Sequence, residues 1–172
     1  GGRLGCAILC EILRTLHKNG ERLPYDLYCT FTTRGEIVRS GVGAAAFGVK
    51  PDCAIFLDGA VAADIPGVPV EKQGAKLDDG PVIAFQENGA AYDGGLFDFL
   101  LALSADTGID CQTKRYANGQ TNAARVAKVD DGVRTASVAL PIRGLGAETN
   151  IASIRDYLAT KELVLAMLRA MD

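Results

Sequence analysis

The sequence predicts a single α/β domain over residues 1–172, in which a mostly parallel sheet lies between two layers of helices (α/β/α). Three observations lead to this prediction. Short apolar, β-rich runs alternate with helical patterns along the chain, an order typical of a parallel sheet covered on both faces. Hydrophobic residues form 48% of the 172 residues, which is enough for a packed core. No internal repeat or low-complexity tract divides the chain.

The first predicted elements are a helix and a strand. The helix spans residues 4–18 and is apolar around most of its circumference, so we expect it to be largely buried. Asn19 and Gly20 end it, because both residues tolerate a left-handed cap. An aromatic and β-rich run over residues 25–31 then predicts a strand.

The remaining elements follow the same alternation. A helix over residues 42–49 stops before Pro51, and the apolar run 53–57 predicts a strand covered on both faces. Residues 60–79 form a long loop whose end, at residues 78–80, is predicted to be a turn. The later elements are a strand at 82–85, a helix at 97–105, a strand at 111–116, a short helix at 121–127, a strand at 135–140 and a helix at 154–171 capped by Ser153.

Composition excludes two classes of partner. The net charge is −3 and no basic cluster exceeds two adjacent residues, so we expect no nucleic-acid binding. No apolar run approaches the length of a membrane span, so we expect no membrane partner. The five cysteines are odd in number and fit no disulfide framework, which favours a reducing, cytoplasmic location.

Cys6 and Cys10 lie one helical turn apart and could reach one metal ion. The favoured interpretation makes both of them small core residues on an apolar helix face. The single histidine, His17, lies within the first helix and is interpreted as a surface or half-buried residue.

Two carboxylates follow predicted strands and are the candidate metal ligands. Glu36 comes after the strand at 25–31, and Asp58 comes after the strand at 53–57. Parallel strands deliver side chains to one edge of a sheet, so the two could meet around a cation. The alternative is that both are solvated strand-end carboxylates. A catalytic zinc site also needs imidazole or thiolate ligands, and His17 is far from either strand end. The residues therefore indicate a hydrolase-like frame whose chemistry has eroded.

Several short motifs occur in a characteristic order. They are Arg3-Leu4-Gly5, Leu23-Pro24-Tyr25-Asp26, Leu57-Asp58, Asp64-Ile65-Pro66-Gly67, Gly80-Pro81-Val82-Ile83 and Gly119-Gln120-Thr121-Asn122-Ala123. In order and spacing they resemble the co-catalytic zinc metallo-aminopeptidases that assemble as tetrahedral dodecamers, a family that includes glutamyl and deblocking aminopeptidases and proteins once called cellulases. The resemblance implies a zinc-exopeptidase-like fold and covers the C-terminal half of the family's catalytic domain, with the family's dimerisation domain absent.

The resemblance also assigns the candidate site. It places Gly35 at the general-base position, so no catalytic residue is predicted, and it keeps Glu36 and Asp58 as vestigial metal ligands. Gly1 stands at the position of a bridging Asp, and Gly146 at the position of a His ligand. In the Gly-Thr-Asp motif Asn122 replaces Asp, and the residues favour a simpler role for it with Thr121, as caps of the short helix. The loop 144–150 is interpreted as a turn.

Three functions remain open. The first is a catalytically degenerate aminopeptidase-like protein with a scaffold or regulatory role. The second is a divergent or fragmentary metal-dependent aminopeptidase, which would use zinc or cobalt if a site survives. The third is a module that binds a peptide or sugar without cleaving it. The expected partners are a homo-oligomer, or the missing N-terminal half of the same protein, and a peptide ligand.

Overall fold

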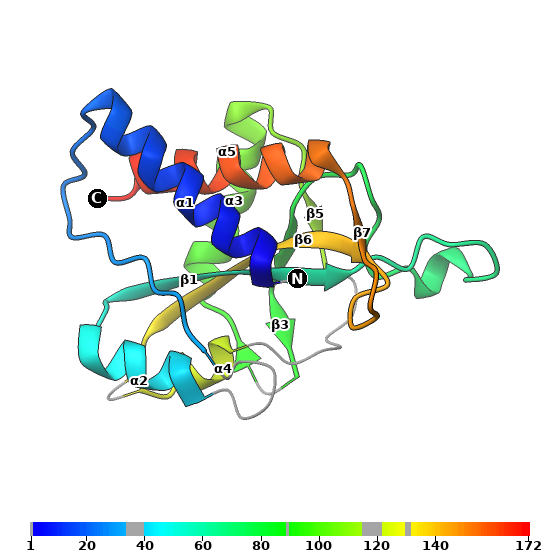
Figure 1. Cartoon of the computed structure of the whole chain (residues 1–172), viewed down its shortest axis with the longest axis horizontal. Helices are drawn as coiled ribbons and strands as arrows, with labels where there is room; N and C mark the ends of the chain where they lie inside the picture. Colours follow the sequence, from blue (N-terminus) through cyan, green and yellow to red (C-terminus); the bar gives the residue numbers. More distant parts are fainter. Residues whose placement is uncertain (1, 34–39, 89, 115–121, 130–131) are drawn as a thin grey trace.

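A computed structural model describes residues 2–33, 40–88, 90–114, 122–129 and 132–172. Its helices form layers on the two faces of a central sheet (Figure 1). One layer holds α1 (Gly2–Asn19), α3 (Gly94–Thr107) and α5 (Ile154–Ala170), whose apolar side chains share the main core cluster. The other holds α2 (Ser40–Val49) and the short α4 (Ala123–Val126). The predicted α/β fold is therefore confirmed.

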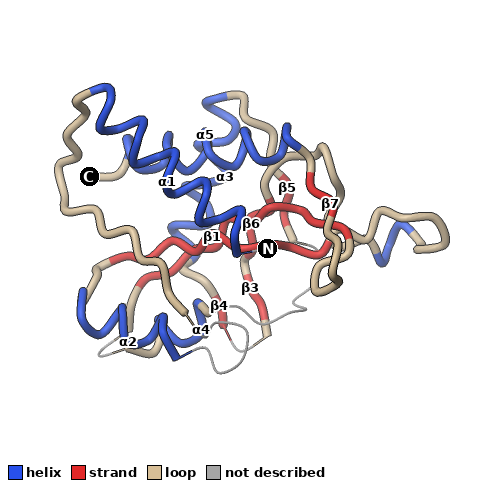
Figure 2. Tube along the Cα trace, in the orientation of Figure 1, coloured by secondary structure: helices blue, strands red, loops and turns tan. Residues whose placement is uncertain are grey.

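The sheet has the strand order β1-β6-β2-β5, with β7 also paired to β6 (Figure 2). Its strands are β1 (Cys53–Val61), β2 (Val82–Ala84), β5 (Gln112–Thr113), β6 (Arg134–Arg143) and β7 (Ile151–Ala152). The longest ladder is parallel and joins β1 to β6 through nine residue pairs. β5 runs parallel to β2, whereas β2 and β7 run antiparallel to β6. The sheet is thus mixed, with parallel pairing in its principal ladder. A separate hairpin joins β3 (Gln86–Glu87) to β4 (Ala90–Ala91).

Strand β6 is the most buried element of the sheet. Its side chains alternate, as a strand requires, so that Val138, Leu140 and Ile142 enter the core under α1, α3 and α5. The strand predicted from the sequence, 135–140, ends before Pro141, because proline has no N–H group to donate to a neighbouring strand. The strand instead continues to Arg143. Pro141 is tolerated there because β2 pairs with β6 only as far as Ala139, which leaves that side of Pro141 without a partner strand.

Two predictions near the N-terminus are wrong. Residues 25–31 are extended but form no strand, because no described strand pairs with them. Helix α1 is buried along one stripe only, formed by Gly5, Ile8, Ile12 and Leu16.

The prediction that Cys6 and Cys10 belong to the core is also wrong, since both thiols are exposed. The predicted exposure of His17 is confirmed. Strand β1 is longer than predicted, and most of it is only half-buried rather than covered on both faces. The five cysteines are all free, as their spacing predicts.

The loop between β1 and β2 is tied to the N-terminus of α5. Asp156 is 1% exposed and accepts hydrogen bonds from the backbone N–H groups of Asp78 and Gly80, each at 2.9 Å. These contacts hold the predicted turn at 78–80, which is confirmed. Burial raises the pKa of the Asp156 carboxyl, while the two N–H donors oppose that shift. Ser153 is the N-cap of α5, as predicted, and its Oγ accepts from the N–H of Arg155 at 3.1 Å.

Helix α1 packs so closely on β1 that Gly5 has no space for a side chain. A Cβ atom at this position would lie 2.6 Å from the carbonyl oxygen of Leu57. We expect Gly5→Ala to lower the free energy of unfolding by about 1–3 kcal/mol, because the helix must move off the strand.

Gly43→Ala is the matched control for this prediction. Gly43 also lies in a helix, α2, but a Cβ there would meet nothing within 4 Å. We expect this change to stabilise the protein by about 0.5–1 kcal/mol, since alanine loses less backbone entropy. Urea unfolding of both variants measures the difference, and equal effects would contradict the close contact.

Candidate functional site

Asp58 lies near the C-terminal end of β1, in register with Ala139 of β6. Its side chain is on the face shared by Phe56 and Ala60, opposite the face that packs on α1, because side chains alternate along a strand. The carboxylate is half-buried, and its Oδ1 accepts a hydrogen bond from the N–H of Gly59 at 2.8 Å. Asp58 therefore lies within β1, before its last three residues, and not after the strand as the sequence predicts. Its role as a metal ligand stays a prediction.

The partner predicted for Asp58 falls outside the described ranges. Glu36 and Gly35 belong to residues 34–39, so their proximity to Asp58 stays a prediction. Within the parts of the chain that are described, no three His, Cys, Asp or Glu side chains gather closely enough to hold a metal ion. Asp58 alone does not fit zinc, which favours several nitrogen and sulfur ligands in a closed geometry.

The segment after β6 forms a tight turn, as its glycines predict. Gly144 and Gly146 have φ angles of +71° and +94°, and the N–H of Ala147 donates to the carbonyl of Gly144 at 2.9 Å. The Asn150 side chain closes the loop by donating to the carbonyl of Ala147 at 3.1 Å. Gly146 is exposed and follows the carboxyl end of β6, which pairs in parallel with β1. The two positions assigned to metal ligands, 58 and 146, therefore lie toward the same end of the principal ladder.

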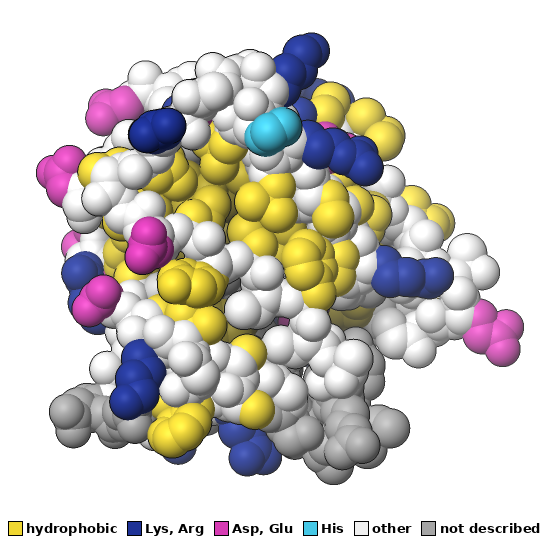
Figure 3. Space-filling model, turned by 60° about the vertical axis from the view of Figure 1, so that its left-hand side comes forward, with side chains coloured by type: hydrophobic (Ala, Val, Ile, Leu, Met, Phe, Trp, Pro, Cys, Tyr) yellow, Lys and Arg dark blue, Asp and Glu magenta, His cyan; other side chains and the backbone are white. Residues whose placement is uncertain are grey.

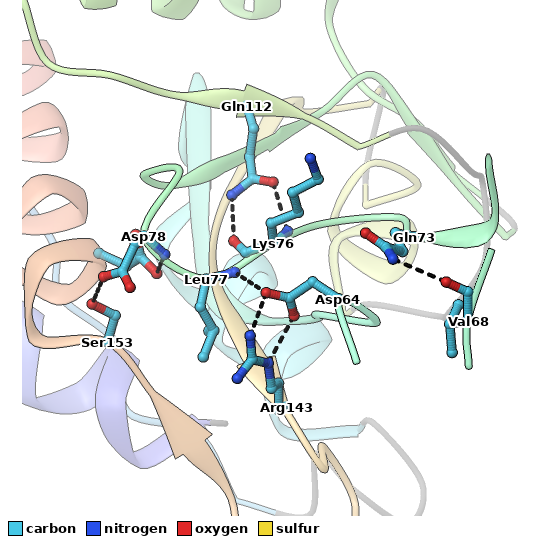
Figure 4. Close-up of polar contacts among 10 residues, drawn as sticks. Asp64, Val68, Gln73, Lys76, Leu77, Asp78, Gln112, Arg143 and Ser153 are labelled. Carbon is cyan, nitrogen blue, oxygen red and sulfur yellow. Dashed lines mark hydrogen bonds and ion pairs between the residues drawn. The ribbon is translucent and has the colours of Figure 1, made fainter. Parts of the chain in front are cut away.

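A paired set of charges fixes the loop beside this end of the sheet (Figure 4). Arg143 donates two hydrogen bonds to Asp64, from Nε to Oδ1 at 2.8 Å and from Nη2 to Oδ2 at 2.6 Å. Asp64 Oδ2 also accepts from the N–H of Leu77 at 3.1 Å. The Arg143 guanidinium lowers the pKa of the Asp64 carboxyl, and Asp64 raises the pKa of Arg143 in return.

Gln112 adds a second tie to the same loop. Its Oε1 accepts from the N–H of Lys76 at 2.9 Å. Its Nε2 donates to the carbonyls of Lys76 and Gly80, at 2.8 Å and 2.9 Å. Strand β5 is thereby joined through one side chain to the loop that also binds Arg143 (Figure 4). The polar groups on this side of the sheet position a loop and are already paired with one another.

A buried ion pair joins β3 to the residue that follows β5, and the sequence did not predict it. The Glu87 carboxylate, 5% exposed, is paired with the ammonium of Lys114 and accepts from the hydroxyl of Tyr92 at 2.6 Å. Glu87 and Lys114 are 27 residues apart, so no local pattern announces the pair. These contacts offset the cost of burying both charges, because an unpaired buried charge is strongly unfavourable.

Two buried oxygens near α4 lack a hydrogen-bond partner within the described part of the structure. They are Oδ1 of Asn122 and Oγ of Ser137, which is 1% exposed. Asn122 occupies the N-cap position of α4, but its side chain makes no capping hydrogen bond, so the predicted capping role is wrong. Thr121, the other predicted cap, lies outside the described residues.

The fold places the chain among aminopeptidase structures. It superposes on an aminopeptidase from the archaeon Desulfurococcus kamchatkensis with a TM-score of 0.92 and 25% identity, covering 98% of this chain and 47% of that one. A TET aminopeptidase from a Thaumarchaeota archaeon gives a TM-score of 0.95 at 24% identity, covering 99% and 47%. The TET1 peptidase of Pyrococcus horikoshii, which can assemble into a tetrahedron or a large octahedral shell, gives 0.68 at 23% identity, covering 82% and 40%.

The family model for M42 glutamyl aminopeptidases matches residues 2–163, and the chain belongs to this family. The curated protein FrvX of Escherichia coli (strain K12) is 30% identical over 162 residues, which are 94% of this chain and 44% of FrvX. A relative from Acetivibrio thermocellus is 24% identical over 155 residues, covering 90% and 45%. The resemblance stated from the motifs is therefore confirmed, and the chain spans less than half the length of these curated relatives.

The Asp64–Arg143 pair predicts a pH dependence. Because the folded-state pKa of Asp64 lies below its ordinary value of 3.8, the pair stabilises the fold above that value. This contribution is lost as the pH falls through the lowered pKa. We expect Arg143→Met to return the Asp64 pKa toward 3.8, as measured by an NMR titration of the carboxyl carbon.

Arg134→Met is the control, because Arg134 pairs with Asp93 and not with Asp64. It should leave the Asp64 titration unchanged. An Asp64 pKa at or above 3.8 in the unaltered protein would contradict the bidentate contact.

Proposed function

We propose that this chain is a metallo-aminopeptidase-like domain that has lost catalysis and serves as a scaffold or regulatory part of an assembly. The observation that carries the proposal is the backbone at Gly146. The resemblance places a His ligand there, yet this residue has a φ of +94°, in a region that favours glycine. The backbone at position 146 has the conformation of a glycine turn, which is unfavourable for a histidine ligand.

The general-base position supports the same proposal. Gly35 carries no proton acceptor, and a general base contributes about 10²–10⁴-fold to the rate of a hydrolytic reaction. Asp58 would be left with Glu36 as a pair of oxygen ligands, which is a weak set for zinc or cobalt. A homo-oligomer is part of the proposal, and the shell-forming TET1 peptidase supports it by its likeness of fold.

A second candidate function follows from the length of the relatives. The chain corresponds to 44% of FrvX and 45% of the Acetivibrio protein, so most of each relative lies outside the match. Residues from that remaining part could complete a metal site around Glu36 and Asp58. The chain would then be part of a metal-dependent aminopeptidase that removes N-terminal residues from peptides.

Metal content distinguishes the two candidates. The chain is tested alone and together with the part of FrvX that lies outside the match. Each sample is incubated with zinc or cobalt and desalted, and its metal is measured by elemental analysis. The proposal predicts far less than one equivalent, and no metal-dependent release of p-nitroaniline from aminoacyl p-nitroanilides, with glutamyl and leucyl substrates included.

The informative variant is Asp58→Ala, with Asp98→Ala as a matched control, since Asp98 is an exposed carboxylate on α3. One or two equivalents of metal that disappear in Asp58→Ala and persist in Asp98→Ala would overturn the proposal in favour of the second candidate.

The positive φ angle of Gly146 leads to a prediction about stability. Gly146→Ala should lower the free energy of unfolding by about 1–2 kcal/mol, because a left-handed conformation brings Cβ too close to the following carbonyl. Ala147→Gly, at the neighbouring exposed position, should cost less. Thermal unfolding measures both, and a neutral Gly146→Ala would show that this backbone can readily hold other residues.

A further inference from the structure

Two of the five cysteines, Cys6 and Cys10, are exposed, whereas the other three are half-buried. Both exposed thiols lie on α1, four residues apart. Residues at this spacing are neighbours on the surface of a helix, with Cβ atoms about 5–6 Å apart. The sequence allows these two side chains to reach one metal ion, and their exposure removes the competing interpretation, in which they fill the core.

Helix α1 is firmly held on its opposite side. Its buried stripe, formed by Gly5, Ile8, Ile12 and Leu16, packs on the sheet. The backbone at Gly5 lies so close to the carbonyl of Leu57 that the helix has no room to rotate. The two thiols are therefore presented to solvent side by side on a rigid element, which lowers the cost of positioning them as ligands.

The spacing of the pair suits an ion held by two sulfur atoms. A metal–thiolate bond is about 2.3 Å long, so two such bonds in a line separate the sulfurs by about 4.6 Å. Side chains with Cβ atoms about 5–6 Å apart reach this separation by rotation about χ1. Among the residues that the structure describes, no three His, Cys, Asp or Glu side chains are placed to share an ion, so the pair has no third ligand there.

This ligand number distinguishes between metals. Structural and catalytic zinc sites take at least three protein ligands, which the pair does not supply. Cu(I) is a soft ion that prefers thiolates, and it is stable with two of them in a linear arrangement. The chemistry of the pair therefore favours Cu(I).

The neighbouring charges also suit such a complex. Two thiolates around Cu(I) carry one net negative charge. Arg3 precedes Cys6 by three residues and Arg14 follows Cys10 by four, so helical spacing places an exposed guanidinium beside each thiol. Positive charge on both sides of the pair favours an anionic complex.

The surface around the pair is apolar. Ala7 and Leu13 are exposed on the same side of α1. Figure 3 shows hydrophobic side chains, with cysteine in the same colour, gathered below the single histidine, which lies near the end of this helix. An apolar shell limits the access of water to a bound metal ion. The surroundings therefore favour a soft ion over one that requires oxygen ligands.

We propose that Cys6 and Cys10 form a two-coordinate site for Cu(I) on the exposed side of α1. Each thiol gives up its proton on binding, so one Cu(I) replaces two protons and no electron is transferred. Binding therefore weakens as the pH falls, because protons compete for the thiolates. The inference does not depend on whether the domain is catalytic, since it uses neither Glu36 nor Asp58.

The test titrates the 172-residue chain, in the absence of oxygen, into Cu(I) held by the coloured chelator bicinchoninate. We expect the chain to withdraw one equivalent of Cu(I). Cys6→Ser and Cys10→Ser should each lower the affinity by at least about tenfold, and the double variant should withdraw none. X-ray absorption at the copper edge should show two sulfur ligands.

Three control variants separate this site from general thiol binding. Cys29→Ser removes a thiol near the pair, since burial and then the charge of Cys10 raise the pKa of Cys29. Cys111→Ser removes a half-buried thiol beside β5. Both variants should keep the full affinity.

The third control combines Cys10→Ser with Arg14→Cys. It keeps two thiols on α1 but places them two turns apart, about 12 Å along the helix axis, so it should not restore binding. Circular dichroism establishes that each variant is folded.

Four results would overturn the proposal. The first is a chain that withdraws no Cu(I). The second is binding that persists in the double variant, which would indicate an adventitious ion only. The third is a loss in Cys29→Ser as large as that in Cys10→Ser, and the fourth is full binding by the variant that carries Arg14→Cys.

Discussion

The parallel ladder between β1 and β6 is the constraint on which the rest of the structure depends. Its register, from Cys53 opposite Arg134 to Val61 opposite Ile142, decides which side chains reach each face. One face of β6 delivers Val138, Leu140 and Ile142 to the main core, where full burial of each contributes about 1.5–3 kcal/mol. A shift by one residue would turn these side chains to the opposite face. The same register sets Asp58 and the Gly144–Gly146 turn at the same end of the ladder.

Paired polar groups then fix the loops that leave the sheet. Asp156 holds the turn before β2, the Asp64–Arg143 pair holds the loop after β1, and Glu87 of β3 binds Lys114, which follows β5. Each carboxylate has at least two hydrogen-bonding or ionic partners, which offsets the cost of removing its charge from water. The polar side chains of this region are therefore largely committed to structure. A structural role for these side chains is consistent with the glycines at positions 35 and 146, which supply no catalytic or metal-binding side chain.

Local patterns were sufficient to predict the elements that complete themselves within the chain. The core strands at β1, β2 and β6, the Ser153-capped helix α5 and the glycine turn after Arg143 follow from apolar runs, a cap and glycines. The predictions of a strand at 25–31 and of buried Cys6 and Cys10 are wrong. Each depends on a neighbouring element that the described part of the chain does not supply.

The residues of the candidate site also include some that local sequence patterns predict and others that they do not. Asp58 was predicted because it follows an apolar run, and Gly146 because it occupies a motif position. The Asp64–Arg143 and Glu87–Lys114 pairs were missed because their members are 79 and 27 residues apart in the sequence. No sequence signal predicts that the buried Ser137 oxygen lacks a hydrogen-bond partner among the described residues.

Hydrogen exchange along β1 tests most directly whether the principal ladder is open on one side. We expect a period of two: the β1 amides directed to β6 exchange slowly and the alternate β1 amides exchange fast, whereas the β6 amides from Ser137 to Ala139, which lie between β1 and β2, all exchange slowly. NMR on the 172-residue chain resolves each amide. Uniform slow exchange along β1 would contradict the account, because it would show that its second edge is already paired.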